Sequence, residues 1–104
     1  MTRNVTVLYT TIGTHQEAEN LAKIVLSQKL AACVNIIPEG KSMYLWNGKI
    51  EQNSECYMLF KTTTVLMQKL EQLIIQKHPY DVPAILKFSP EASEKFVDYI
   101  STCI

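Results

Sequence analysis

The hydrophobic positions follow two different periods in the first thirty residues. Residues 4–12 are mainly β-branched or aromatic, as is typical of a β-strand. Gly13 interrupts this run, and Thr14 with Glu17 three residues later has the pattern of a helix capping box. The apolar residues that follow recur about every 3.6 positions, which predicts a helix with one buried face. They are Ala18, Leu21, Ala22, Val25 and Leu30.

Residues 31–63 predict a long β-hairpin, and the other elements are arranged around it. Asn47-Gly48 stands between two β-forming runs, and this dipeptide favours a two-residue type I′ turn because both of its positions need a positive φ. Such a turn pairs Trp46 with Lys49. Carried along both arms, the same register pairs Leu45 with Ile50, Ile37 with Met58, and Asn35 with Phe60.

The first arm of this hairpin is longer than the domain that carries it. Its residues 32–46 would reach about 50 Å when fully extended, whereas a domain of this length is only about 30 Å across. The tip is therefore expected to overhang the domain, and Pro38 and Gly40 are expected to introduce a bend or bulge. The tip is apolar, which predicts a partner: it carries Met43, Tyr44, Leu45 and Trp46.

The second half of the chain repeats the order of helix and strand. A threonine run at residues 62–64 offers caps for a second helix, which Pro79 ends, because the residue before a proline is pushed out of the α region. Residues 84–88 predict a short last strand, and Ser89-Pro90-Glu91 predicts the start of a terminal helix. The apolar stripes of the two helices are Leu66, Leu70, Leu73 and Ile74, with Lys77 in line, and Phe96, Val97 and Ile100.

The order β-α-β-β-α-β predicts an α+β fold, a single ferredoxin-like sandwich over residues 1–104 with an extra C-terminal helix and a long protruding β-hairpin. Right-handed crossovers would place both long helices on the same face of the sheet. The opposite face would then carry apolar side chains without cover from the same chain. We therefore expect that other copies of the chain bury this face.

Composition and charge exclude several classes of function. The chain has 10 basic and 10 acidic residues, so it has no electrostatic drive toward nucleic acid or an anionic membrane. No apolar run approaches the roughly 20 residues of a transmembrane helix, and the N-terminus has no signal-peptide core, which predicts a cytoplasmic protein. The three cysteines are an odd number without close spacing, and reduced thiols are expected.

The most unusual segment is His78-Pro79-Tyr80-Asp81-Val82-Pro83, whose two prolines make a stiff loop. Such a loop can hold an imidazole, a phenol and a carboxylate in fixed directions, or it can simply stop the preceding helix. Cys33 is expected to pack as a small apolar side chain, although a thiol nucleophile is the alternative. Lys61 interrupts an apolar strand, so it either extends to the sheet end or serves a pocket.

Familiar motifs for metals and phosphates are missing from the sequence. The two histidines form no HxxxH pair, there is no CxxC pair, and the three glycines stand alone rather than in a phosphate loop. Acylphosphatase-like hydrolysis on this fold needs an arginine in a phosphate-binding loop, and the only arginine is Arg3 in the N-terminal tail. We therefore do not expect an enzyme.

Four motifs in order resemble the CutA divalent-cation tolerance family: KLAACVNIIP at 29–38, YLWNGKIE at 44–51, FKTT at 60–63 and HPYDVP at 78–83. The resemblance implies a ferredoxin-like subunit of a homotrimer, with hairpins crossing onto neighbours and sheets facing inward. It also implies a role in tolerance of, or response to, divalent metals, copper in particular, with no defined molecular activity.

The resemblance also implies which residues to examine as a site. Copper-binding relatives carry a cysteine near the end of the first strand and two adjacent histidines before Pro-Tyr, where this chain has Tyr9 and Lys77-His78. His78 is thus the one remaining metal-ligand candidate, a weak one, for an ion such as copper. Cys33 matches a family position interpreted as packing.

A cleft between subunits is the second expected site, for a metal ion or a small ligand. Its candidates are Lys61, Tyr80 and Asp81, with Glu55 and Trp46 contributed by a neighbouring subunit. An alternative interpretation is a trimeric small-molecule-binding signalling or protein-interaction module that resembles the nitrogen-regulatory PII proteins. Their effector loop has no counterpart in this sequence, and fold analogy alone does not decide function.

Overall fold

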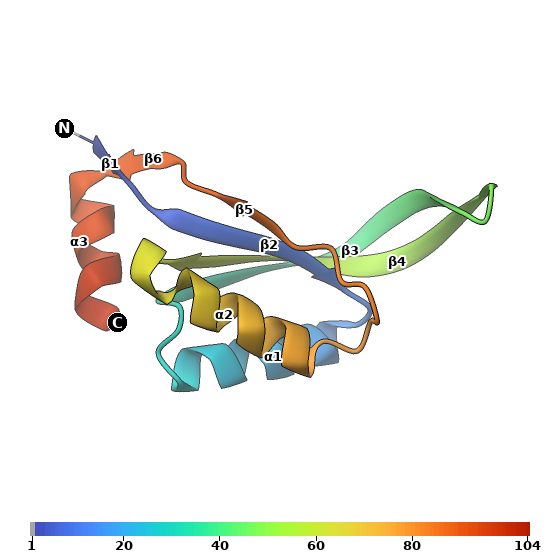
Figure 1. Cartoon of the computed structure of the whole chain (residues 1–104), viewed down its shortest axis with the longest axis horizontal. Helices are drawn as coiled ribbons and strands as arrows, with labels where there is room; N and C mark the ends of the chain where they lie inside the picture. Colours follow the sequence, from blue (N-terminus) through green and yellow to red (C-terminus); the bar gives the residue numbers. More distant parts are fainter. Residues whose placement is uncertain (1) are drawn as a thin grey trace.

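The structure of the chain is a computed structural model that describes residues 2–104 (Figure 1). For Thr2 it describes only the backbone, and Met1 of the expected domain 1–104 lies outside the described residues. The strands are β1 Thr2–Asn4, β2 Thr6–Ile12, β3 Cys33–Trp46, β4 Lys49–Thr62, β5 Leu86–Phe88 and β6 Glu91–Ser93. The helices are α1 His15–Ser27, α2 Thr64–Lys77 and α3 Glu94–Cys103. Among residues 2–104, no helix is long and apolar enough to cross a membrane.

The main sheet has the order β3-β4-β2-β5, and every neighbouring pair of strands is antiparallel. Helix α1 connects β2 to β3, and α2 connects β4 to β5; in each case one other strand lies between the connected pair. These are two interleaved split β-α-β units, the ferredoxin-like arrangement predicted from the sequence. A separate two-stranded sheet joins β1 to β6 near the chain termini.

Helices α1 and α2 contact each other and cover one face of the sheet (Figure 1). The expected capping pattern starts α1: the Thr14 side chain is the N-cap and accepts a hydrogen bond from the Glu17 backbone N–H at 3.1 Å. The α2 helix ends at Lys77, directly before His78 and Pro79. The core between helices and sheet contains the largest fully buried side chains, among them Phe60, Leu8, Ile12, Met58, Leu70 and Ile74.

The hairpin turn is the one that the sequence predicts. Asn47 and Gly48 have φ of 51° and 76°, as a type I′ turn requires. Trp46 pairs with Lys49 across the turn, and the predicted register continues from there down to Gly40 opposite Glu55.

Below Gly40 the predicted register is wrong by one residue. The pairing shifts between Ile37 and Gly40, so Ile37 lies opposite Tyr57 rather than Met58, and Asn35 opposite Leu59 rather than Phe60. Pro38 and Gly40 do produce the expected bulge, and the bulge adds one residue to β3. Side chains alternate between the two faces of a strand. This single extra residue therefore places each side chain in the lower half of β3 on the face opposite to the predicted one.

Gly40 is required at the bulge by the close approach of an aromatic ring. A Cβ at this position would lie 2.3 Å from Cζ of Tyr57. The Tyr57 hydroxyl in turn donates a hydrogen bond to the Lys41 carbonyl at 2.9 Å, which fixes the ring across the bulge. The positive φ at the bulge belongs to Glu39, at 60°.

The C-terminal region begins its helix later than the sequence predicts. Residues 91–93 form β6 and pair with β1, so α3 starts at Glu94 and not near Ser89-Pro90. The Ser93 side chain caps α3 by accepting a hydrogen bond from the Phe96 backbone N–H. The last strand of the main sheet covers only Leu86–Phe88 of the predicted 84–88.

The second face of the sheet is covered only in part. Helix α3 closes one end of it, where Ile100 packs with Val5 and Val7. Beyond α3, three apolar side chains on this face remain between 45% and 60% exposed: Ile37, Leu86 and Phe88. This uncovered face, which contains the outward side chains of β2 and β5, is the one expected from the order of elements.

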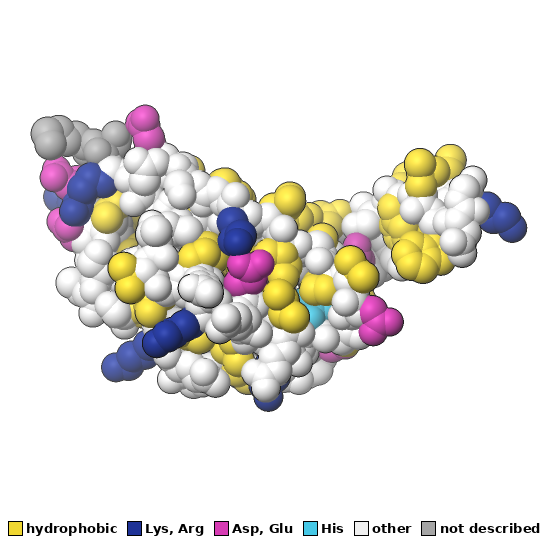
Figure 2. All heavy atoms as spheres, viewed as in Figure 1, with side chains coloured by type: hydrophobic (Ala, Val, Ile, Leu, Met, Phe, Trp, Pro, Cys, Tyr) yellow, Lys and Arg dark blue, Asp and Glu magenta, His cyan; other side chains and the backbone are white. Residues whose placement is uncertain are grey.

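The hairpin projects past the sheet that supports it (Figure 1). Strand β2 ends at Ile12 opposite Cys56, so among residues 2–104 no third strand lies beside the part of the hairpin between Cys56 and the turn. The described chain accordingly measures 46 × 27 × 23 Å. Figure 2 shows hydrophobic side chains over this projection, where Met43, Leu45 and Ile50 are each between 64% and 75% exposed.

Candidate functional site

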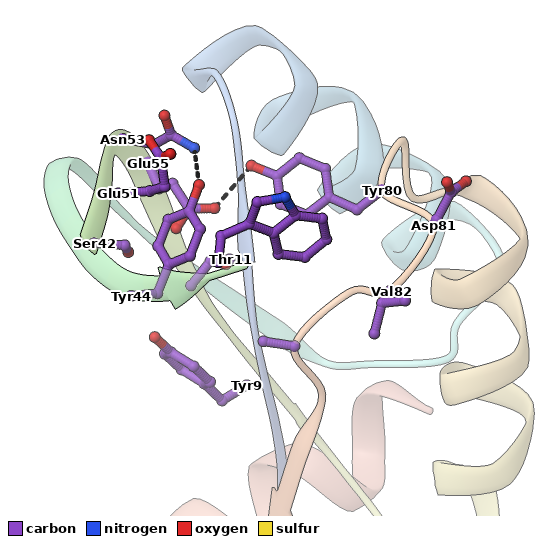
Figure 3. Close-up of a pocket in the computed structure, with 12 residues that line it drawn as sticks. Tyr9, Thr11, Ser42, Tyr44, Glu51, Asn53, Glu55, Tyr80, Asp81 and Val82 are labelled. Carbon is purple, nitrogen blue, oxygen red and sulfur yellow. Dashed lines mark hydrogen bonds between the residues drawn. The ribbon is translucent and has the colours of Figure 1, made fainter. Parts of the chain in front are cut away.

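A groove of about 710 Å³ lies between the outer half of the hairpin and the loop after α2 (Figure 3). The strands contribute most of its lining, and the loop 80–84 contributes the rest. The lining residues are Tyr9, Thr11, Ser42, Tyr44, Trp46, Glu51, Asn53, Glu55, Tyr80, Asp81, Val82 and Ala84.

Strand alternation explains how the hairpin contributes to the groove. Glu51, Asn53 and Glu55 are at every second position of β4 and so point to one face. The residues opposite Glu51 and Asn53 in β3 are Tyr44 and Ser42, which share this face. It is the same side of β4 that carries Tyr57 and Leu59 at the base, because β4 contains no bulge. The groove therefore opens on the face of the sheet that the long helices leave uncovered.

The floor of the groove is the carboxylate of Glu55, whose residue is only 8% exposed. The Tyr80 hydroxyl donates to its Oε2 at 2.7 Å (Figure 3). Burial alone would raise the pKa of Glu55, but hydrogen bonds from Ser42, Tyr80 and Thr11, with the nearby His78, together lower it below its usual value. Glu55 is thus a buried carboxylate that stays ionised at neutral pH through neutral hydroxyl donors.

The tyrosines around Glu55 stay protonated. Burial raises the pKa of Tyr80 strongly, and the hydrogen bond to Glu55 with the charge of that carboxylate raises it further. Burial, followed by Tyr57 and Glu55, also raises the pKa of Tyr9. Near the hairpin end of the groove, the Tyr44 hydroxyl accepts a hydrogen bond from Asn53 Nδ2 at 2.7 Å (Figure 3). The raised pKa values of Tyr80 and Tyr9 mean that these two phenols act as hydrogen-bonding groups and ring surfaces, and not as bases.

His78 is buried behind the groove, and both of its ring nitrogens have partners. Nε2 lies 2.7 Å from the Thr11 carbonyl, and Nδ1 accepts the Tyr80 backbone N–H at 3.1 Å. These partners assign the proton to Nε2, because a carbonyl can only accept. The imidazole therefore ties the loop after α2 to the end of β2. A metal ion at His78 would have to displace one of these two bonds.

Metal-ligating side chains do not converge in the described part of the chain. Residues 2–104 contain no group of three or more His, Cys, Asp or Glu side chains arranged to hold a metal ion. The groove has three carboxylates, Glu51, Glu55 and Asp81, and its lining includes no Lys, Arg or His. It is acidic and aromatic, without a coordination centre.

Four of the five expected cleft residues lie together in this groove. Trp46, Glu55, Tyr80 and Asp81 line it, and all four belong to one chain, although Glu55 and Trp46 were expected from a neighbour. Lys61 is placed elsewhere: it is opposite Val7 and Cys33 on the sheet, and its Nζ lies 5.6 Å from the centre of the Phe96 ring.

Cys33, the expected packing residue, begins β3 and is half-buried. All three cysteines are free thiols. Cys56 is the most buried of the three, within the core under the helices.

Eight of the twelve lining residues were not expected from the sequence: Tyr9, Thr11, Ser42, Tyr44, Glu51, Asn53, Val82 and Ala84. The alternation of Glu51, Asn53 and Glu55 along one strand was a usable signal, because these positions share a face in any extended conformation. Tyr9 and Thr11 had no such signal, since their place depends on a loop that returns from residues 78–84.

Comparisons with known proteins agree with this fold over nearly the whole chain. Residues 6–103 match the CutA1 divalent ion tolerance protein family. The divalent-cation tolerance protein CutA of Yersinia pestis (strain Pestoides F) is 42% identical over 98 residues, which cover 94% of this chain and 81% of the relative.

Solved structures of similar sequence have the same fold. The divalent ion tolerance protein CutA1 from Ehrlichia chaffeensis superimposes with a TM-score of 0.92 at 39% identity, covering 97% of this chain and 95% of that one. The periplasmic divalent cation tolerance protein CutA from Archaeoglobus fulgidus gives a TM-score of 0.90 at 36% identity, covering 95% and 97%. By both sequence and structure, this chain belongs to the CutA1 divalent ion tolerance protein family.

Proposed function

We propose that this protein acts in tolerance of divalent cations, copper in particular, as a homotrimer whose subunit boundaries contain the groove. The observation that carries the proposal is the uncovered sheet face, because it is apolar and continuous with the groove. In this proposal the protein binds and responds, and it catalyses no reaction. No particular contact in the described chain favours a PII-like signalling role instead.

Support for assembly comes from the exposed apolar side chains. Large apolar patches on soluble proteins mark interaction surfaces, and a closed symmetric assembly would cover the same patch in each copy. Phe88 and Leu86 on the uncovered face and Trp46 on the hairpin are all available for such contacts. Neighbouring hairpins would then border the groove of each subunit.

Sedimentation velocity at micromolar concentration tests the assembly. We expect a species of three times the chain mass, and we expect Trp46→Ala and Phe88→Glu to shift it toward the monomer. Truncating a well-buried aromatic side chain costs about 3–5 kcal/mol, which is enough to dissociate a moderate interface. Val65→Glu is the control, since Val65 is also exposed but lies on α2. A stable monomer for the unmodified chain would overturn the proposal.

The proposed contact of copper with a single chain is weak and centres on His78. One imidazole is a poor site without further ligands, and this ring already uses both nitrogens. Isothermal titration with Cu(II) should give no submicromolar site, and the weak binding should decrease in His78→Ala. A tight site with one metal per chain that persists in His78→Ala would refute this part of the proposal.

We further propose a cytoplasmic location. Three free thiols support it, because disulfides form and persist in oxidising compartments. The relative from Archaeoglobus fulgidus is described as periplasmic, so the proposal needs its own test. Fractionation of the native host cells, followed by immunodetection, should find the chain in the cytoplasmic fraction. Its recovery from another compartment would overturn this proposal.

A further inference from the structure

The charges of the groove are all of one sign. Its lining contains the carboxylates of Glu51, Glu55 and Asp81 and no cationic side chain, although the chain as a whole has equal numbers of acidic and basic residues. None of these three carboxylates has an ion-pair partner among residues 2–104; the ion pairs of the described chain involve Asp98, Glu19 and Glu71. The groove therefore offers uncompensated negative charge to a ligand.

The walls of the groove are aromatic. Tyr9, Tyr44, Trp46 and Tyr80 all line it, and their rings provide faces of negative electrostatic potential as well as apolar area. An aromatic face attracts a cation that has an organic body more effectively than it attracts a small hydrated metal ion, because the organic cation loses less hydration on contact. The same rings can cover an aliphatic chain.

Glu55 is suited to long-range attraction rather than to metal coordination. It is about nine-tenths buried and already accepts hydrogen bonds from neutral hydroxyls, including that of Tyr80 at 2.7 Å. Its lone pairs are therefore largely occupied, while its charge is not neutralised. A divalent ion would need direct oxygen ligands in a regular arrangement, and the described residues provide no such group.

We propose that this groove binds an organic ammonium cation, with the charged nitrogen toward Glu55 and Glu51 and the aliphatic part along the aromatic walls. Its volume of about 710 Å³ is within the range of small-molecule sites in proteins. This inference deepens the proposed ligand role of the cleft and rests on it. Copper binding and the number of subunits are tested separately, by the titration and the sedimentation described above.

The chain carries its own reporter for this site, because Trp46 is its only tryptophan and lines the groove. Tryptophan emission of the full chain would be followed during titration with hexylamine, which is an ammonium ion at pH 7. Two matched probes accompany it: hexan-1-ol, with the same chain length and no charge, and Mg²⁺, with charge and no organic body. We expect hexylamine to change the emission saturably, hexan-1-ol to need at least about tenfold higher concentration, and Mg²⁺ to have no comparable effect.

Charge variants assign the effect to the groove. Glu55→Gln and the exposed Glu51→Gln should each weaken hexylamine binding about three- to tenfold, since each removes one negative charge and little volume. Glu94→Gln on α3 removes the same charge outside the groove and should leave binding unchanged. If Glu55→Gln does not fold, Glu51→Gln alone decides.

Any one of four results would overturn the proposal: equal binding of amine and alcohol, no binding of hexylamine, binding of Mg²⁺ in its place, or equal effects of Glu94→Gln and Glu51→Gln.

Discussion

Both halves of the hairpin carry large apolar side chains, and these side chains have opposite surroundings. At the base, Met58 and Phe60 are fully buried beneath α1 and α2. At the tip, Met43 and Ile50 are mostly exposed, and no third strand from residues 2–104 pairs with this part of the hairpin. The apolar character of a single side chain does not show which surroundings it has. Whether an apolar side chain stabilises this chain or is left for a partner depends on the end of β2, beyond which the chain provides no cover.

The largest effect that tests this comparison is the loss of the core ring at the base. Phe60→Ala should lower the free energy of unfolding by about 3–5 kcal/mol, because it leaves a cavity in a closed core. The loss should be the same at every protein concentration, as measured by urea denaturation over a hundredfold dilution series.

The matched change at the tip is Ile50→Ala. If other copies cover the tip, its cost should appear at high concentration and disappear on dilution, because association stabilises only the assembled state. A concentration-independent loss close to that of Phe60→Ala would mean that the tip is part of the core of a single chain, contrary to the comparison.

The boundary between the two halves is the bulge, and Gly40→Ala should disturb it. The new Cβ would approach the Tyr57 ring to 2.3 Å, so the ring must move and its hydrogen bond to the Lys41 carbonyl is lost. We expect a loss of about 1–3 kcal/mol in the free energy of unfolding, the usual range for overpacking. Thermal and urea denaturation would measure it.

A control glycine and a double-mutant cycle identify the cause. Gly48→Ala at the turn should cost about 1–2 kcal/mol through its positive φ, since no atom lies within 4 Å of the added Cβ. Tyr57→Ala should relieve most of the cost of Gly40→Ala and none of the cost of Gly48→Ala. Additive effects of Gly40→Ala and Tyr57→Ala would show that the ring is not the reason for the glycine.

The bulge also marks how far the sequence could predict the structure. The order of the elements in the main sheet and its two long helices, the Asn47-Gly48 turn and the register of the tip agree with the structure, whereas the small sheet of β1 and β6 was not predicted. Pro38 and Gly40 indicated a bulge, but the sequence does not tell which strand gains the extra residue or how many residues it gains. One residue was enough to reverse the faces of the lower half of β3.

The candidate site was predictable in part for the same reason. Tyr80 and Asp81 were identified because their segment, HPYDVP, stands out by its two prolines and resembles the CutA family. Their position against Glu55 could not be predicted, because it depends on the contact of His78 with the Thr11 carbonyl, which are 67 residues apart in the chain. The sequence left open whether Lys61 extends to the sheet end or serves a pocket, because a charge within an apolar strand does not reveal whether a helix, here α3 with Phe96, will cover it.

The smallest expected effect concerns the link between the hairpin and the loop, the hydrogen bond from Tyr80 to Glu55. Tyr80→Phe should lower the free energy of unfolding at pH 7 by about 1 kcal/mol, the usual net contribution of such a bond. The pKa of Glu55 is lowered in the folded chain, so its ionised form contributes stability that is complete above the ordinary value of 4.5 and is lost as the pH falls through the lower folded value. Removing the Tyr80 donor raises the folded pKa of Glu55, so the variant and the unmodified chain should differ most at neutral pH and converge in acid.

Tyr44→Phe, which loses only the neutral Asn53 partner, is the control and should show a difference that does not change with pH. Urea denaturation at pH 7 and at pH 3 compares the two variants, and a Tyr80→Phe effect of equal size at both values would show that the bond does not depend on the charge of Glu55.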